Sequence, residues 1–120
     1  MSSIWWVVGA TAGALGVILG AFGAHALKSR VGVDMLAVFE TGVRYQMYHA
    51  LALLAVGVVA QRGPGTWTQA AGWLFVAGIV IFSGSLYVMT FTGARWLGAI
   101  TPFGGVAFIL GWIALALAAR

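Results

Sequence analysis

Four long apolar segments, separated by short polar breaks, make up most of this chain of 120 residues. They cover about residues 4–27, 43–60, 68–91 and 101–118. Roughly 20 apolar residues cross a hydrocarbon core about 30 Å thick, so the pattern predicts four transmembrane spans. The spans lack the alternation of barrel strands and should be helices, because backbone polar groups in lipid need internal partners. We therefore expect an all-α membrane protein, a single domain over residues 1–120 folded as an antiparallel bundle of four transmembrane helices with small-residue packing faces.

The polar breaks carry recognisable helix-end signals. The Gly-Pro-Gly sequence at 63–65 predicts a tight turn between the second and third spans. Thr101 followed by Pro102 is typical of an N-cap and first helical residue, so the fourth helix should begin there. An amphipathic stretch starting near Asp34 is expected to continue into the second span.

Composition narrows the class of protein further. Of all residues, 62% are hydrophobic and only 7% are charged, which is too few charges to cover a soluble domain of this size. The chain has no cysteine, so disulfides, thiolate metal sites and cysteine nucleophiles are excluded. The net charge of +4 is scattered, with no dense basic run, so no nucleic-acid partner is expected.

Loop charges predict the orientation. The side holding the first and third loops carries four basic residues, and the opposite side carries Arg62 and Arg120. The positive-inside rule then places the first and third loops in the cytoplasm and both termini outside. The four basic residues are Lys28, Arg30, Arg44 and Arg95.

Small residues recur on one face of the first, third and fourth segments. The chain has 18 glycines, and at about 100° per residue the five in the middle of the first segment fall within about 80° of one another. Lipid tails are as apolar as leucine, so helix association in a bilayer depends on the close backbone approach that such faces permit. The glycines expected to pack against neighbouring helices are Gly9, Gly13, Gly16, Gly20, Gly23, Gly78, Gly104 and Gly111.

Polar side chains gather toward one end of the predicted bundle. On a helical projection, Glu40, Arg44 and Tyr48 form one stripe of the second span. Another polar stripe lies nearly opposite, with apolar residues between the two, so this half of the helix should be covered by protein, headgroups, a wet cavity or another subunit. In an antiparallel bundle the third span adds two serines to the same side. The candidate polar cluster comprises His25, Glu40, Arg44, Tyr45, Gln46, Tyr48, His49, Ser83 and Ser85.

Each of these residues has a structural and a functional interpretation. Glu40 and Arg44 have the spacing of an intrahelical ion pair, which we interpret as structural, with a gate or proton relay as the alternative. His25 and His49 lie toward the same membrane side, and structural hydrogen bonding is favoured over proton handling or binding of haem or a metal. No third ligand stands at a characteristic spacing, so no metal or cofactor is expected.

The sequence offers no motif for a reaction. It has no phosphate loop, nucleophile elbow or metalloprotease motif, so we expect no enzyme. The favoured hypothesis is a non-enzymatic helical-bundle interaction or structural module in the lipid bilayer, acting as a homo-oligomer. The alternatives are a channel or transporter for protons, ions or a small solute using the polar cluster, and a haem or metal carrier through His25 and His49. No small-molecule or ion ligand is identified.

Four ordered motifs resemble a known family of small membrane proteins. Gly20–Leu27, Tyr45–Leu54, Phe82–Tyr87 and Gly98–Gly105 are similar to signatures of the YgdD/YwdK-like family, catalogued as domain of unknown function 423. The family is in turn similar to eukaryotic transmembrane protein 256. The resemblance covers nearly the whole chain. It implies a four-span protein of the bacterial inner membrane, and it implies no established activity or catalytic residues.

Overall fold

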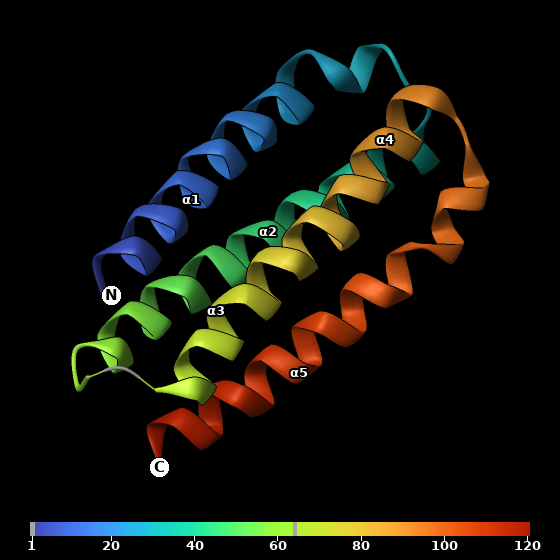
Figure 1. The fold of residues 1–120 in the computed structure, drawn as a ribbon. Coiled ribbons are helices and arrows are strands. Elements are labelled where there is room, and N and C mark those ends of the chain that lie inside the picture. The colour runs from blue at the N-terminus through green and yellow to red at the C-terminus, as the bar shows by residue number, and fades with distance from the viewer. Residues whose placement is uncertain (1, 64) are drawn as a thin grey trace.

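Antiparallel helices account for almost the whole chain in a computed structural model, which describes residues 2–63 and 65–120 (Figure 1). Four helical stretches of the described residues are long and apolar enough to cross a membrane. The predicted all-α bundle with small-residue packing faces is confirmed. Its elements are α1 (Ser2–His25), the 3-10 helix η1 (Leu27–Ser29), α2 (Val33–Ala60), α3 (Thr66–Gly78), the π-helical turn η2 (Ile79–Ser83), α4 (Gly84–Thr92), the 3-10 helix η3 (Arg95–Ala99) and α5 (Thr101–Ala119).

The bundle is elongated, with extents of 47 × 27 × 16 Å. Sequential spans are neighbours: α1 lies on α2, α2 lies on the continuous α3–η2–α4 span, and that span lies on α5. Both chain ends lie at the same end of the bundle (Figure 1). The helix α2 alone is about 42 Å long at 1.5 Å per residue, which exceeds the thickness of a hydrocarbon core.

The glycines of α1 allow this helix to pack closely on α2. A Cβ atom at Gly9 would come within 2.9 Å of the carbonyl oxygen of Ala50, and one at Gly23 would come within 3.0 Å of the Phe39 ring. The glycine-rich face of α1 therefore packs directly on the backbone and side chains of α2. Its partners form the apolar stripe of the second span, namely Phe39, Val43, Met47, Ala50 and Leu54.

Glycines also allow the third span to pack closely on α5. A Cβ atom at Gly78 would meet the ring of Phe108, and one at Gly111 would come within 2.7 Å of the Phe75 ring. A Cβ atom at Gly104 would clash with backbone atoms of Phe82, which belongs to the π-helical turn. An extra residue in a helical turn displaces the local backbone, and here the displaced segment contacts a helix that has no side chain at that point.

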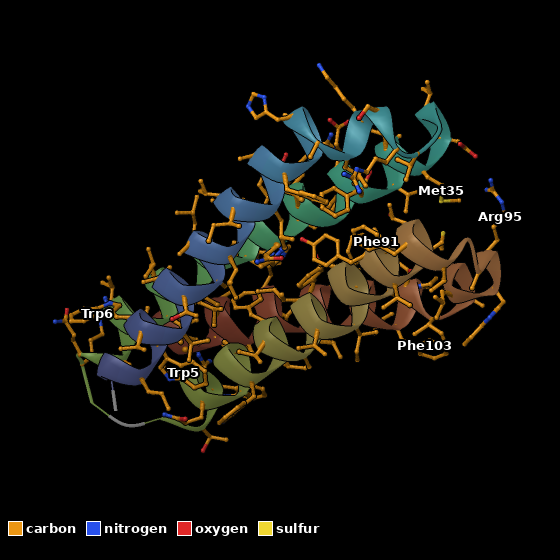
Figure 2. The ribbon with its side chains drawn as sticks, turned by 90° about the horizontal axis from the view of Figure 1, so that it is seen from above. Trp5, Trp6, Met35, Phe91, Arg95 and Phe103 are labelled. Atoms are coloured by element: carbon orange, nitrogen blue, oxygen red, sulfur yellow. The ribbon has the colours of Figure 1, made fainter. Side chains whose placement is uncertain are left out.

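Trp5 departs from what its position in the sequence suggests. Tryptophans near span ends are typical interfacial anchors, yet only 1% of Trp5 is exposed, and its indole lies in the space left by Gly72. It meets Trp73 edge to face with ring centroids 5.3 Å apart. Figure 2 shows Trp5 on the inner side of α1 and its neighbour Trp6 at the edge of the bundle. Trp5 is therefore part of the hydrophobic core.

The helix ends are tied by a few polar contacts. Arg95 at the start of η3 forms an ion pair with Asp34 in the first turn of α2, with nitrogen and oxygen 2.6 Å apart, which links the third connection to the start of α2. At the opposite end, Arg62 donates a hydrogen bond to the carbonyl oxygen of Ala119. Both partners of the ion pair are largely exposed, so it fixes geometry more than it adds stability.

The predicted N-cap at Thr101 is wrong. The helix α5 does begin at Thr101, with Pro102 in its first turn, but the capping position falls on Ile100 and no side chain caps it. Because η3 runs into α5 through an αR residue, the Thr101 hydroxyl is free to donate back to the carbonyl oxygen of Leu97. Pro64, at the centre of the predicted Gly-Pro-Gly turn, lies outside the described residues.

Adjacent glycines provide a test of close packing. We expect Gly104→Ala to lower the free energy of unfolding by about 1–2 kcal/mol, because the added methyl group meets the Phe82 backbone, which cannot move independently. Gly105→Ala is the matched control, since its Cβ would lie 4.0 Å from the nearest Phe82 atom. This control should be neutral or stabilising by up to about 1 kcal/mol. Unfolding measured in bicelles would contradict the packing account if both variants behaved alike.

Candidate functional site

Gln46 is the residue through which three spans meet. It is 4% exposed and lies beside the midpoint of α2. Its side-chain Nε2 donates to the carbonyl oxygen of Ala12 in α1 at 2.8 Å, and its Oε1 accepts from the hydroxyl of Tyr87 in α4 at 2.6 Å. The side chain reaches the α1 backbone because Gly16 is bare there: a Cβ on Gly16 would lie 3.6 Å from Nε2.

Ser83 adds a second polar link between α2 and the third span. Its hydroxyl donates to the carbonyl oxygen of Gly42 at 2.6 Å, and the side chain is fully buried. Gly42 also makes room for Tyr87, whose ring would be 2.8 Å from a Cβ at that position. The π-helical turn ends at Ser83, so the turn, the serine and the bare glycine together hold Tyr87 within reach of Gln46.

Both ring nitrogens of His49 have hydrogen-bond partners. Its Nδ1 lies 2.7 Å from the carbonyl oxygen of Tyr45, and its Nε2 lies 3.1 Å from the indole nitrogen of Trp112 in α5. An indole N–H can only donate, so Nε2 accepts and Nδ1 carries the proton that it donates to Tyr45. The imidazole also stacks on Phe108 with centroids 3.6 Å apart and planes 7° apart. Both nitrogens of a neutral histidine are therefore already used.

Ser85 makes the fourth polar link, between α4 and α5. Its hydroxyl lies 2.6 Å from that of Thr101 and 2.9 Å from the carbonyl oxygen of Phe82. The structure thus separates the predicted polar cluster into distinct buried links, one centred on each of Gln46, Ser83, His49 and Ser85. Each link joins helices, which is the role that polar side chains commonly have in membrane bundles.

The remaining predicted residues lie outside this interior. His25, Glu40 and Arg44 are exposed. The predicted Glu40–Arg44 ion pair is wrong, because the ion pair found in the described part of the chain joins Arg95 to Asp34. His25 and His49 do not share a site: Gly23 faces Phe39, whereas His49 lies about 15 Å further along the α2 axis. Among the described residues no three possible ligands cluster to hold a metal.

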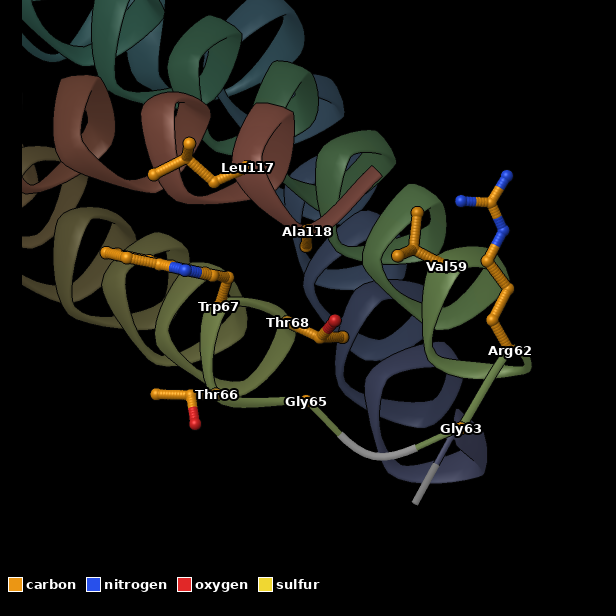
Figure 3. A pocket seen from close by; sticks show the side chains of 9 residues that line it. All are labelled: Val59, Arg62, Gly63, Gly65, Thr66, Trp67, Thr68, Leu117 and Ala118. Atoms are coloured by element: carbon orange, nitrogen blue, oxygen red, sulfur yellow. The ribbon is translucent and has the colours of Figure 1, made fainter. Parts of the chain in front are cut away.

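Among the hollows that described residues line on the surface of the bundle, three differ in position and size. One, of about 230 Å³, lies at the end that holds both termini, where Arg62, Trp67 and Leu117 surround it (Figure 3). A second, of about 300 Å³, lies between α1 and α2 beside Glu40 and Arg44. The largest, of about 580 Å³, is an aromatic groove between α2 and α5 with His49 in its wall. The described interior between the helices is filled by apolar side chains such as Leu53 and Phe75, neither of which is exposed.

Comparison with known proteins assigns the family. A family model described as "Protein of unknown function (DUF423)" matches residues 19–105. The chain belongs to the DUF423 family. The matched DUF423 region contains all the hydrogen-bonding residues of the four polar links except Ala12 and Trp112.

Curated relatives of this DUF423 protein span nearly its full length. It is 51% identical over 118 residues to UPF0382 membrane protein YwdK of Bacillus subtilis (strain 168), covering 97% of this chain and 95% of the relative. It is 48% identical over 115 residues to UPF0382 membrane protein SAB0533 of Staphylococcus aureus (strain bovine RF122 / ET3-1), covering 93% and 91% of the two chains. No solved structure matches the chain. The names of the relatives describe membrane proteins and state no activity.

Sequence reasoning about this DUF423 chain missed two partners. The sequence does not pair Trp112 with His49, although Trp112 stands near the middle of the fourth span, and that depth is the signal for a hydrogen-bonding role. Phe108, which stacks on His49, gave no signal because phenylalanine is common in lipid-facing positions. Tyr87 was visible as a polar residue on the third span, but nothing in the sequence paired it with Gln46.

The Gln46–Tyr87 bond can be measured by a double-mutant cycle. We expect Tyr87→Phe to lower the free energy of unfolding by about 0.5–1.5 kcal/mol, because the buried Gln46 Oε1 loses its donor. In a Gln46→Met background the same substitution should cost less than half as much, since its partner is already gone.

Tyr48→Phe serves as the control for this cycle, because the Tyr48 hydroxyl bonds to no described residue. It should change the unfolding free energy by less than about 0.5 kcal/mol. Strict additivity of Gln46→Met and Tyr87→Phe would show that the bond does not hold α2 to α4.

Proposed function

We propose that this DUF423 protein is a non-enzymatic interaction module of the bacterial inner membrane and that it works as a homo-oligomer joined through the outer face of α2. The observation that supports this proposal is the placement of Glu40 and Arg44. Both face outward from α2, and neither forms an ion pair within the described residues. Other polar side chains of the spans, such as Gln46 and His49, bond between helices, whereas these two charges have no such partner among the described residues.

The two charges lie at one end of the predicted second span, residues 43–60. Arg44 falls just inside this span, and Glu40 lies about 5 Å beyond it along the α2 axis. Ionisable groups within a membrane span pair with one another, reach the headgroups or face a protein surface. Arginine can extend its charge toward the interface. A partner that neutralises both residues removes the need for Arg44 to extend toward the membrane surface.

A second copy supplies complementary charges by symmetry. If two α2 helices pack about a two-fold axis along the membrane normal, Glu40 of each copy faces Arg44 of the other, because a two-fold interface is reciprocal. The two residues differ in height by about 6 Å, and the long Arg44 side chain can extend toward the helix N-terminus to the level of Glu40. Ala37 and Ala55 lie exposed on the same face and permit close approach.

The closed interior favours an interaction module over a pore through one copy. Phe39, Leu53, Val56 and Phe75 are fully buried between the spans, so a wet path would require these side chains to move. The buried hydroxyl of Ser83, the Gln46 amide and the His49 imidazole already bond to partners within the bundle. The loop charges favour the first and third loops in the cytoplasm and both termini outside.

Disulfide crosslinking tests the homo-oligomer, since the chain has no cysteine of its own. Oxidation of Ala55→Cys in native membranes should give a covalent dimer, because the residue lies on the outer face of α2. Ala10→Cys is a matched control: it is also an exposed alanine, at a similar depth on α1, and should stay monomeric. Equal dimer yields from both variants, or none from either, would contradict an interface on α2.

Charge reversal tests the reciprocal pairing. Glu40→Arg alone and Arg44→Glu alone should each reduce the yield of the Ala55→Cys dimer by about five- to tenfold, because like charges then meet across the interface. The double variant Glu40→Arg/Arg44→Glu restores both pairs and should recover the dimer. Unchanged dimer yields in the single variants would remove the ion pairs from the proposal.

A further inference from the structure

The aromatic groove between α2 and α5 has walls of an unusual composition for a surface that faces lipid. Tyr45, Tyr48 and His49 line it from α2, Phe108 and Trp112 line it from α5, and Phe82 lines it from the π-helical turn. Its volume of about 580 Å³ lies within the range of small-molecule sites, which are commonly apolar with a few polar groups. The groove exists because the third span separates α2 from α5 and because Gly105 contributes no side chain to its rim.

The groove lies deep in the bilayer. Tyr45, Tyr48 and His49 are all within about 4 Å along the axis of the midpoint of α2, and Phe108 and Trp112 are within about 3 Å of the midpoint of α5. Water is scarce at this depth, so a polar group on the wall has to find its hydrogen-bond partner in protein or in a bound molecule.

Two hydrogen-bond donors in the groove are unused. The hydroxyls of Tyr45 and Tyr48 bond to none of the described residues, and the two side chains are 36% and 51% exposed. The other polar groups on the wall cannot serve them, since both nitrogens of His49 and the Trp112 N–H are already engaged. The groove therefore offers donors and flat aromatic surfaces, and it carries no charge. It is complementary to an uncharged, planar molecule with hydrogen-bond acceptors.

We propose that this groove binds a membrane quinone, whose planar head packs on the aromatic wall and whose carbonyl oxygens accept hydrogen bonds from Tyr45 and Tyr48. The apolar tail of a quinone continues along the lipid-facing surface between α2 and α5, where Ile109 is 61% exposed. A fatty acid or a phospholipid headgroup fits less well, because each brings a charge that no residue of the groove neutralises. The site goes beyond the proposed dimer and adjoins its face, because Tyr48 lies on the same stripe of α2 as Glu40 and Arg44.

Tryptophan fluorescence gives a direct measure of binding to the purified full-length protein in nanodiscs. Menadione is the probe, and methylnaphthalene, which has a similar shape but no carbonyl oxygens, is its matched control. Menadione should bind at least tenfold more tightly than methylnaphthalene and should quench the emission of Trp112. The Trp112→Phe variant should lose the quenched component, whereas Trp73→Phe, at an exposed residue outside the groove, should retain it.

Tyrosine variants assign the acceptor contacts. Tyr45→Phe and Tyr48→Phe should each weaken menadione binding by about fivefold, the effect of one neutral hydrogen bond, and leave methylnaphthalene binding unchanged. These variants keep the fold, because neither hydroxyl bonds to a described residue. Tyr87→Phe removes a hydroxyl that points to Gln46 instead of the groove, so it should alter stability and leave menadione affinity as it was.

Two results would overturn the proposal. Equal affinity for menadione and methylnaphthalene, unaffected by the tyrosine variants, would show a groove filled by apolar lipid chains without recognition. Covalent dimers from Ile109→Cys in membranes, together with no menadione binding, would show that a second copy covers the groove. Because neither result involves the Ala55→Cys dimer, failure of the quinone site is distinguishable from failure of the proposed function.

Discussion

Close approach of helix backbones at glycines is the constraint on which the rest of this structure depends. A bilayer provides no hydrophobic force between apolar helices, so the spans associate through contact and through hydrogen bonds that contact permits. At Gly9 the α1 backbone comes close to the carbonyl oxygen of Ala50, and at Gly104 the α5 backbone meets that of Phe82. Only with helices this close can the short side chains of Gln46, Ser83 and Ser85 reach a neighbouring span.

Because the helices lie so close together, the buried polar side chains can hydrogen-bond between them, and these bonds stabilise the bundle. Gln46 joins α1, α2 and α4, Ser83 joins the π-helical turn to α2, and His49 joins α2 to α5. Each group finds a partner inside the bundle, which lipid requires. What is left for a function lies on the outside: the charges of Glu40 and Arg44 on one face of α2, and next to them the two phenol groups of the aromatic groove, of which Tyr48 belongs to the same stripe as the charges. The charged residues are complementary to a charged protein face, and the groove is complementary to an uncharged molecule.

Most of the fold could be predicted from the sequence, because lipid limits a spanning chain to few solutions. The number of spans, their antiparallel order and the small-residue faces followed from segment length, loop length and the spacing of glycines such as Gly9 and Gly16. The end signals were less informative. Thr101 followed by Pro102 has the form of an N-cap, but the preceding 3-10 helix continues into α5 and leaves the hydroxyl to other partners.

The side-chain partners could not be predicted to the same degree, because they depend on helix rotation and height. The i, i+4 spacing of Glu40 and Arg44 permits a pair, yet their outward direction leaves both exposed, and Asp34 pairs with Arg95 across a distance in sequence that no local pattern encodes. The sequence pattern places His25 and His49 toward the same side of the membrane, but in the structure they lie at different levels along the bundle axis. The π-helical turn, which sets Ser83 and Phe82 in place, has no signature in the sequence of the third span.

The most direct measurement of this account is an NMR study of glycine-labelled protein in lipid nanodiscs. Close backbone approach predicts cross-relaxation between the α protons of Gly9 and the protons of Ala50. It also predicts that a spin label on the lipid tails leaves the signals of Gly9, Gly16 and Gly104 sharp. Strong broadening of these glycines by the lipid label, with no contact between Gly9 and Ala50, would contradict it.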